Sequence, residues 1–196
     1  MLASLLVSAL QDRAPVPVPA IVSRAEWGAM PPVIALVPHR VKFITVHHAG
    51  VGRKTEPSFF TRLRNLQAWS QRDDFLAGGR EKPKWSDIPY HYYIDWDGTT
   101  AECREIVFPG DTNTTYDVWG HALVCLEGSL STDEFTQGQK DSLTALVTWL
   151  AWRYRVPSDN IKGHKDYAPG ETDCPGDAAY AELPALREHV KRALGR

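Results

Sequence analysis

The pattern of apolar and polar positions predicts a mixed domain of strands and helices after residue 21. Residues 41–48 form a short, β-branched and apolar run that ends before Gly50, which is typical of a strand. Both faces of this run are apolar, so we expect the strand to lie centrally in a sheet. His47 would then lie at the carboxyl end of the strand, where open α/β sheets place their chemistry.

The same patterns predict the other elements. Apolar residues recur at helical spacing over residues 56–72, and Asp97-Gly98 between two strand-like runs is a strong hairpin signal. Thr136 and Gln139 fit a capping box at the start of the longest helix. The expected elements are a helix over 56–72, a polar loop over 73–87, a hairpin of 90–96 with 99–106, a strand over 121–126, a helix from 136 to about 154, a loop-rich segment over 158–182 and a helix over 183–194. The fold class is therefore α/β, with a central mixed β-sheet flanked by helices in a single domain.

The first 21 residues are set apart from this domain. Residues 2–10 are apolar and small like the core of a secretory signal, but no Lys or Arg precedes them. Residues 14–20 alternate with proline and predict an extended linker. We expect residues 1–21 to be a signal or linker and residues 22–196 to be the domain, and a location outside the cell or in the cell envelope is compatible with this.

Composition excludes several classes of protein. The 196 residues carry a formal net charge of −2, whereas nucleic-acid binders usually have a basic excess. No apolar run reaches the roughly 20 residues that span a bilayer. Separately, we expect the protein to be a monomer. Three cysteines do not build a disulfide framework: Cys103 and Cys125 fall in expected strands as small core residues, with a disulfide between them as the alternative.

The candidate chemistry lies in two histidines and the third cysteine. His164 precedes Cys174 by ten residues in a loop-rich segment, and His47 ends the first strand. Imidazole and thiolate are ligands that suit Zn²⁺, and three protein ligands leave one coordination position open for water. If these residues meet in space, the pattern predicts a zinc hydrolase.

Seven short motifs in order carry a family resemblance. They are residues 22–29 (VSRAEWGA), 46–48 (VHH), 89–92 (PYHY), 97–99 (DGT), 124–128 (VCLEG), 163–166 (GHKD) and 172–176 (TDCPG). With these motifs, the segment 22–190 resembles the zinc-dependent N-acetylmuramoyl-L-alanine amidases of the amidase-2 type, a family that includes the peptidoglycan recognition proteins and the T7-type phage lysozymes.

The resemblance implies both a site and a reaction. His47, His164 and Cys174 match the zinc ligands of the family, and Tyr90 matches a tyrosine that helps catalysis there. Thr172 stands where the phage-lysozyme branch has a catalytic lysine and the recognition-protein branch commonly has threonine, so we expect it to donate a weaker hydrogen bond to the oxyanion. The implied reaction is hydrolysis of the amide bond between N-acetylmuramic acid and L-alanine of peptidoglycan.

Three other functions stay open at this point. A non-catalytic peptidoglycan-binding module is the first, although inactive members of the recognition branch typically lose the ligand cysteine that this chain keeps as Cys174. A cysteine peptidase using Cys174 and His164 is the second, and a structural zinc site with a fourth protein ligand is the third.

Adjacent strand residues point to opposite faces, so His48 is expected to pack rather than to bind the same metal. The candidate groove residues, by position alone, are Trp85, Trp96, Asn113, Asp117 and Trp119.

Overall fold

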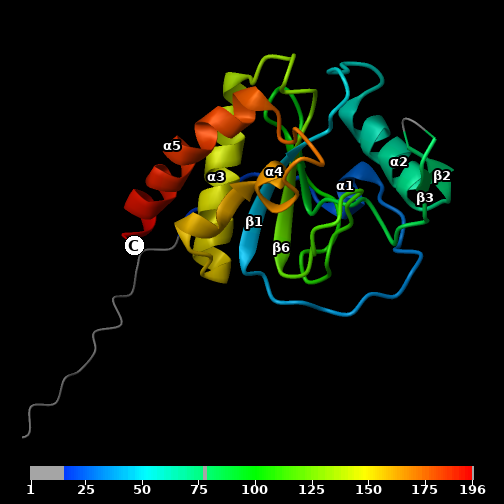
Figure 1. The fold of residues 1–196 in the computed structure, drawn as a ribbon, viewed down its shortest axis with the longest axis horizontal. Coiled ribbons are helices and arrows are strands. Elements are labelled where there is room, and N and C mark those ends of the chain that lie inside the picture. The colour runs from blue at the N-terminus through cyan, green and yellow to red at the C-terminus, as the bar shows by residue number, and fades with distance from the viewer. Residues whose placement is uncertain (1–15, 77–78, 196) are drawn as a thin grey trace, which may run out of the picture.

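A five-stranded mixed sheet forms the centre of the molecule in the computed structural model, which describes residues 16–76 and 79–195 (Figure 1). The strand order is β5-β4-β6-β1-β7. Strand β6 is parallel to both of its neighbours and β1 is parallel to β7, whereas β5 is antiparallel to β4. The strands are β1 (Phe43–His48), β4 (Tyr92–Ile94), β5 (Thr100–Glu102), β6 (His121–Leu126) and β7 (Ile161–Gly163). The expected central mixed sheet is confirmed, while the apolar residues 2–10 lie outside the described residues.

Helices cover both faces of the sheet. Helices α3 (Gln137–Tyr154) and α5 (Asp177–Leu194) pack on one face, where they form the larger apolar cluster with strand residues such as Ile44 and Val124. Helices α1 (Arg24–Trp27) and α2 (Phe59–Ser70) cover the other face, where Trp27 and Leu63 pack with residues of β4 and β6. The sheet is thus buried on both sides, as parallel strands require.

Strand β1 is central and buried from Ile44 to His48. Ile44 and Val46 belong to the cluster under α3 and α5. Because side chains alternate along a strand, Thr45 and His47 face the opposite side of the sheet. His47 pairs in register with Cys125 of β6. The first predicted strand and the place of His47 at its carboxyl end are therefore confirmed.

The predicted hairpin and the predicted helix cap are both present. Strands β4 and β5 pair across the turn at Asp97-Gly98, and Gly98 has φ +93°, a conformation that favours glycine. A Cβ atom on Gly98 would lie 2.7 Å from the carbonyl oxygen of Gly138, so this turn packs closely on the start of α3. Thr136 caps α3 in a capping box with Gln139.

Three segments have more regular structure than the sequence patterns predict. Helix α5 begins at Asp177 and carries Pro184 inside it, because Leu183 before the proline and Leu186 after it both pack into the core. The segment expected to be loop-rich contains the 3-10 turn η1 (Ser158–Asn160), strand β7 and helix α4 (His164–Tyr167). The polar loop contains the small hairpin of β2 (Asp74–Phe75) and β3 (Glu81–Lys82).

The cysteines outside the candidate site are core residues. Cys103 and Cys125 are both free and fully buried in the cluster beneath α2, so the alternative of a disulfide between them is wrong. Val16 and Ile21, which belong to the segment expected to be a linker, pack against the larger cluster. Among the described residues, no helix is both long and apolar enough to cross a membrane.

Candidate metal centre

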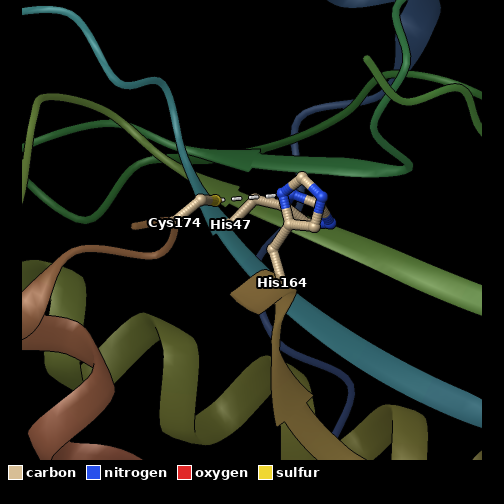
Figure 2. Close-up of side chains that lie close together, drawn as sticks. All are labelled: His47, His164 and Cys174. Atoms are coloured by element: carbon tan, nitrogen blue, oxygen red, sulfur yellow. Dashed lines mark hydrogen bonds between the residues drawn. The ribbon is translucent and has the colours of Figure 1, made fainter. Parts of the chain in front are cut away.

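Three elements bring His47, His164 and Cys174 together at one edge of the sheet (Figure 2). His47 lies near the end of β1, His164 is the first residue of α4 directly after β7, and Cys174 precedes α5. Since β1 and β7 are parallel neighbours, their carboxyl ends meet at this edge. One ligand atom from each residue lies within 4.8 Å of the others, and Sγ of Cys174 is 3.6 Å from Nδ1 of His47.

The backbone around Cys174 holds the thiol in place. The backbone N–H of His48 donates to Sγ at 3.3 Å, and the carbonyl of Cys174 accepts a hydrogen bond from the N–H of Lys165 at 2.8 Å. Burial raises the pKa of the Cys174 thiol to about 12. Without a cation the residue is therefore a neutral thiol, and only a bound metal would hold it as thiolate at neutral pH.

The two histidines are held through their outer nitrogens. Nε2 of His164 lies 2.7 Å from Oγ1 of Thr114, and Nε2 of His47 lies 3.4 Å from the hydroxyl of Tyr116. In the tautomer in which each Nε2–H donates to these oxygens, each Nδ1 is free to bind a cation. Burial lowers the pKa of His47 well below its usual range and that of His164 to about 4, so both rings are neutral at pH 7.

This donor set fits a zinc ion. Two neutral imidazoles and one potential thiolate are the ligand types of zinc sites, and hydrogen bonds to the outer nitrogens are the usual support of such ligands. Two nearby residues that could offer a fourth ligand have other partners: Nδ1 of His48 accepts the N–H of Leu130, and the carboxylate of Asp166 accepts hydrogen bonds from the N–H of Gly163 and the hydroxyl of Tyr180. Among the described residues, the group of possible ligands has three members, and all three line a cavity of about 540 Å³.

Tyr90 and Thr172 line the same cavity. The ring of Tyr90 lies 5.3 Å from that of His47. Burial raises the pKa of Tyr90 well above its usual range, which keeps the phenol protonated and able to donate. Oγ1 of Thr172 accepts the N–H of Cys174 at 3.1 Å, so the hydroxyl proton remains available for another acceptor.

A second, more apolar cavity of about 380 Å³ continues from the first. Its apolar lining comes mainly from α2 and includes Phe59, Leu63 and Trp69. The two cavities share five lining residues, which are Ala49, Trp85, Pro89, Tyr90 and Asn113. The metal-ligand group therefore lies in the polar half of a longer cleft, which we call the cleft below.

The predicted groove residues divide between the cleft and other places. Trp85 and Asn113 line both halves of the cleft. Trp96 lies in the turn of the β4–β5 hairpin, where its carbonyl accepts a hydrogen bond from Thr136. Asp117 bonds the N–H of Trp119, whose ring packs edge-on against His39.

The loop that supports the histidines was not found by sequence reasoning. Thr114 and Tyr116 belong to a segment between β5 and β6 whose only sequence signal is a run of hydroxyl residues, Thr112 and 114–116. Glu171, near Cys174, accepts hydrogen bonds from both the N–H and the hydroxyl of Thr115. This contact ties the histidine-supporting loop to the loop that carries the thiol.

Comparisons with known proteins agree with this geometry. Residues 37–177 match the Amidase_2 family model, described as N-acetylmuramoyl-L-alanine amidase. The chain is 30% identical to peptidoglycan-recognition protein SD of Drosophila simulans over 169 residues, which is 82% of each chain. It is 27% identical to the endolysin of Enterobacteria phage T3 over 120 residues, which is 59% of this chain and 71% of the phage protein.

The fold is shared with a solved amidase structure. The endolysin N-acetylmuramoyl-L-alanine amidase LysCS of Clostridium intestinale superposes with a TM-score of 0.65 at 24% identity, covering 87% of this chain and 96% of that chain. Sheet, flanking helices and domain size therefore agree with those of this family. The chain belongs to the Amidase_2 family, whose members include amidases, phage endolysins and peptidoglycan recognition proteins.

Proposed function

We propose that the protein is a zinc-dependent amidase that hydrolyses the bond between N-acetylmuramic acid and the L-alanine of the peptidoglycan stem peptide. The observation that carries this proposal is the convergence of His47, His164 and Cys174 in the polar half of a cleft. The family by itself supports either hydrolysis or recognition of peptidoglycan, because its members carry both kinds of name. A complete set of three ligands with supported histidines favours hydrolysis.

The reaction would use the residues around the ligand group. Zinc held by His47, His164 and Cys174 supplies a Lewis acid for the amide carbonyl and makes water nucleophilic near pH 7. The protonated phenol of Tyr90 donates a hydrogen bond to the oxyanion that develops at the carbonyl, and the hydroxyl of Thr172 donates a second one. The cleft holds the rest of the muropeptide, so that the scissile bond lies beside these donors.

The proposal includes the surroundings in which the protein works. Peptidoglycan is the partner, which requires a place outside the cell or in the cell envelope, and residues 1–21 are then a signal or linker ahead of the catalytic domain at 22–196. We infer that the protein acts as a monomer, because the residues proposed to act on the substrate all come from one chain. A cysteine peptidase is disfavoured by the raised pKa of Cys174, since a nucleophilic cysteine needs a thiolate.

Release of new L-alanine amino termini from purified sacculi tests the proposal. We expect release by the zinc-loaded protein, loss of activity with a chelator and recovery with added Zn²⁺. Cys174→Ala should still bind sacculi but release no peptide, whereas Cys103→Ala, a matched change of a buried thiol in the core, should remain active. Binding without release by zinc-loaded wild type would instead indicate a recognition module. Activity that a chelator leaves unchanged and a thiol alkylator abolishes would indicate a cysteine peptidase.

A further inference from the structure

Lys82 is buried although it lies in a polar segment of the sequence. It ends β3, and its side chain is among the largest that are fully buried, with the residue 1% exposed. Nζ donates to three backbone carbonyls, those of Ser70 at 3.1 Å, Arg72 at 2.9 Å and Pro83 at 3.0 Å. Two of these carbonyls lie at the carboxyl end of α2, where a positive charge is favourable.

The same ammonium group lies between two tryptophan rings. Nζ is 4.7 Å from the ring centroid of Trp69 and 4.5 Å from that of Trp85, and the two rings meet edge to face at 5.5 Å. A cation within about 6 Å of an indole face is attracted to it. The backbone N–H of Trp85 also donates to the carbonyl of Ser70 that Lys82 binds. Lys82 therefore fixes both the ring and the backbone surroundings of Trp85.

Trp85 is placed where the orientation of its ring matters for the cleft. It lines both the polar and the apolar half, and Trp69 lines the apolar half. Trp85 is itself 7% exposed, so its ring is mostly enclosed and only part of it faces the cleft. A change in the support behind the ring would alter the cleft wall without touching the metal ligands.

We propose that Lys82 is a positioning residue that holds Trp85 and Trp69 as the aromatic wall of the apolar half of the cleft, and so sets how tightly a muropeptide binds. This inference rests on the proposed function, because it takes the muropeptide as the ligand of the cleft. Lys82 itself does not touch the reacting atoms. Its removal is expected to change substrate binding and to leave the chemical step intact.

The test compares Lys82→Met with Lys84→Met. Lys84 is exposed two residues away, so its change removes the same charge without the contacts to the rings. We expect Lys82→Met to weaken muropeptide binding to the metal-free protein about tenfold, as measured by calorimetry, and to raise KM similarly with kcat within about twofold. Lys84→Met should match wild type. Acrylamide should quench the tryptophan emission of Lys82→Met more strongly.

A double-mutant cycle separates positioning from a purely structural role. Trp85→Leu should weaken binding to a similar degree, and Lys82→Met combined with Trp85→Leu should add little, because both act through one wall. If Lys82→Met does not fold, Lys82→Gln carries the same test, since it keeps hydrogen-bond donors but loses the charge.

The outcomes also separate this inference from the proposed function. A folded Lys82 variant that binds the muropeptide as wild type does would overturn the inference alone. Wild type that binds without hydrolysis, together with weaker binding by the variant, would overturn the amidase proposal and leave the inference standing. Wild type that binds no muropeptide would overturn both.

Discussion

The metal-ligand histidines are each held by a hydroxyl group on the side away from the ligand group. Thr114 bonds Nε2 of His164, and Tyr116 lies at hydrogen-bond distance from Nε2 of His47. An imidazole that is free to rotate loses entropy on binding a metal, and the wrong tautomer presents a proton to it. These hydroxyl groups therefore prepare the nitrogens that would bind zinc.

Removing the hydroxyl of Thr114 is expected to weaken zinc binding. Thr114→Val keeps the shape of the side chain but leaves Nε2 of His164 without this partner, and loss of such support typically costs about tenfold or more in metal affinity. Competition with a chromogenic chelator measures the affinity of the metal-free protein for Zn²⁺. Thr114→Ser, which keeps the hydroxyl, should bind nearly as wild type does. Equal affinities for the Val variant and wild type would show that the hydrogen bond has no such role.

For single residues, the sequence predicts those whose side-chain chemistry is distinctive. It does not predict those whose role depends on where the fold places them. His47, His164 and Cys174 stand out because their side chains suit a metal and match family motifs. Thr114 and Lys82 carry no such signal, since threonine in a loop and lysine in a polar segment are ordinarily exposed. Their roles arise only when a loop folds over the histidines and a hairpin closes on the end of α2.

Among the elements, α3 shows how local sequence signals and tertiary contacts combine. Thr136 caps the helix by accepting the N–H of Gln139 at 3.1 Å, and its hydroxyl donates to the carbonyl of Trp96 at 2.6 Å. The cap therefore also fastens the turn of the β4–β5 hairpin to the helix. The capping box was visible in the sequence, but the contact with the hairpin was not.

Loss of this cap is expected to destabilise the fold without affecting the site. Thr136→Ala should lower the free energy of unfolding by about 1 kcal/mol, the usual cost of losing a threonine cap. Urea unfolding followed by circular dichroism measures the change, and Thr136→Ser serves as the control because it retains the hydroxyl. Zinc affinity should be the same in all three proteins. A stability equal to wild type in the Ala variant would contradict the assigned cap.

Element boundaries were predictable where a local signal marks them. Strands β1 and β6 and the start of α3 follow from apolar runs, a glycine and a capping box. The start of α5 carries no such signal. Pro184 favours a helix that begins close to it, whereas the structure begins the helix at Asp177, because Ala179 and Leu183 pack into the core. Strand β7 is short and gains its structure from pairing with β1, which no local pattern reveals.

For the molecule as a whole, several buried histidines make stability depend on pH. His91 is fully buried, with Nδ1 accepting the N–H of Leu123 and Nε2 donating to the carbonyl of Phe108, each at 2.8 Å. Burial lowers the pKa of His91 to about 3 and that of His121 to about 4. In the unfolded chain both pKa values lie near 6.5.

The sign of the effect follows from these pKa values. Above pH 6.5 neither state binds the proton and the full stability is present, whereas below it the unfolded chain takes up protons that the folded chain does not. For His91 the free energy of unfolding should fall by about 1.4 kcal/mol per pH unit as the pH drops from about 6.5 toward 3. Urea midpoints of metal-free protein at pH 7.5, 6.0 and 5.0 measure the slope, and His91→Gln should make it shallower. A constant midpoint across this range would refute the assignment.

Strand β1 gives the site a side chain from His47 and a peptide N–H from His48, both directed at the sulfur of Cys174. A mutation at position 48 changes an imidazole that accepts the N–H of Leu130, but every substitution except proline keeps the peptide N–H that reaches the sulfur. The contacts of the imidazole therefore decide which side chains position 48 tolerates, while the N–H donor to the sulfur stays in place. A slip of β1 by one residue along β6, in contrast, would exchange the two histidines and take away both contributions at once. The register of β1 against β6 is thus itself a requirement of the metal site, although no single side chain determines it.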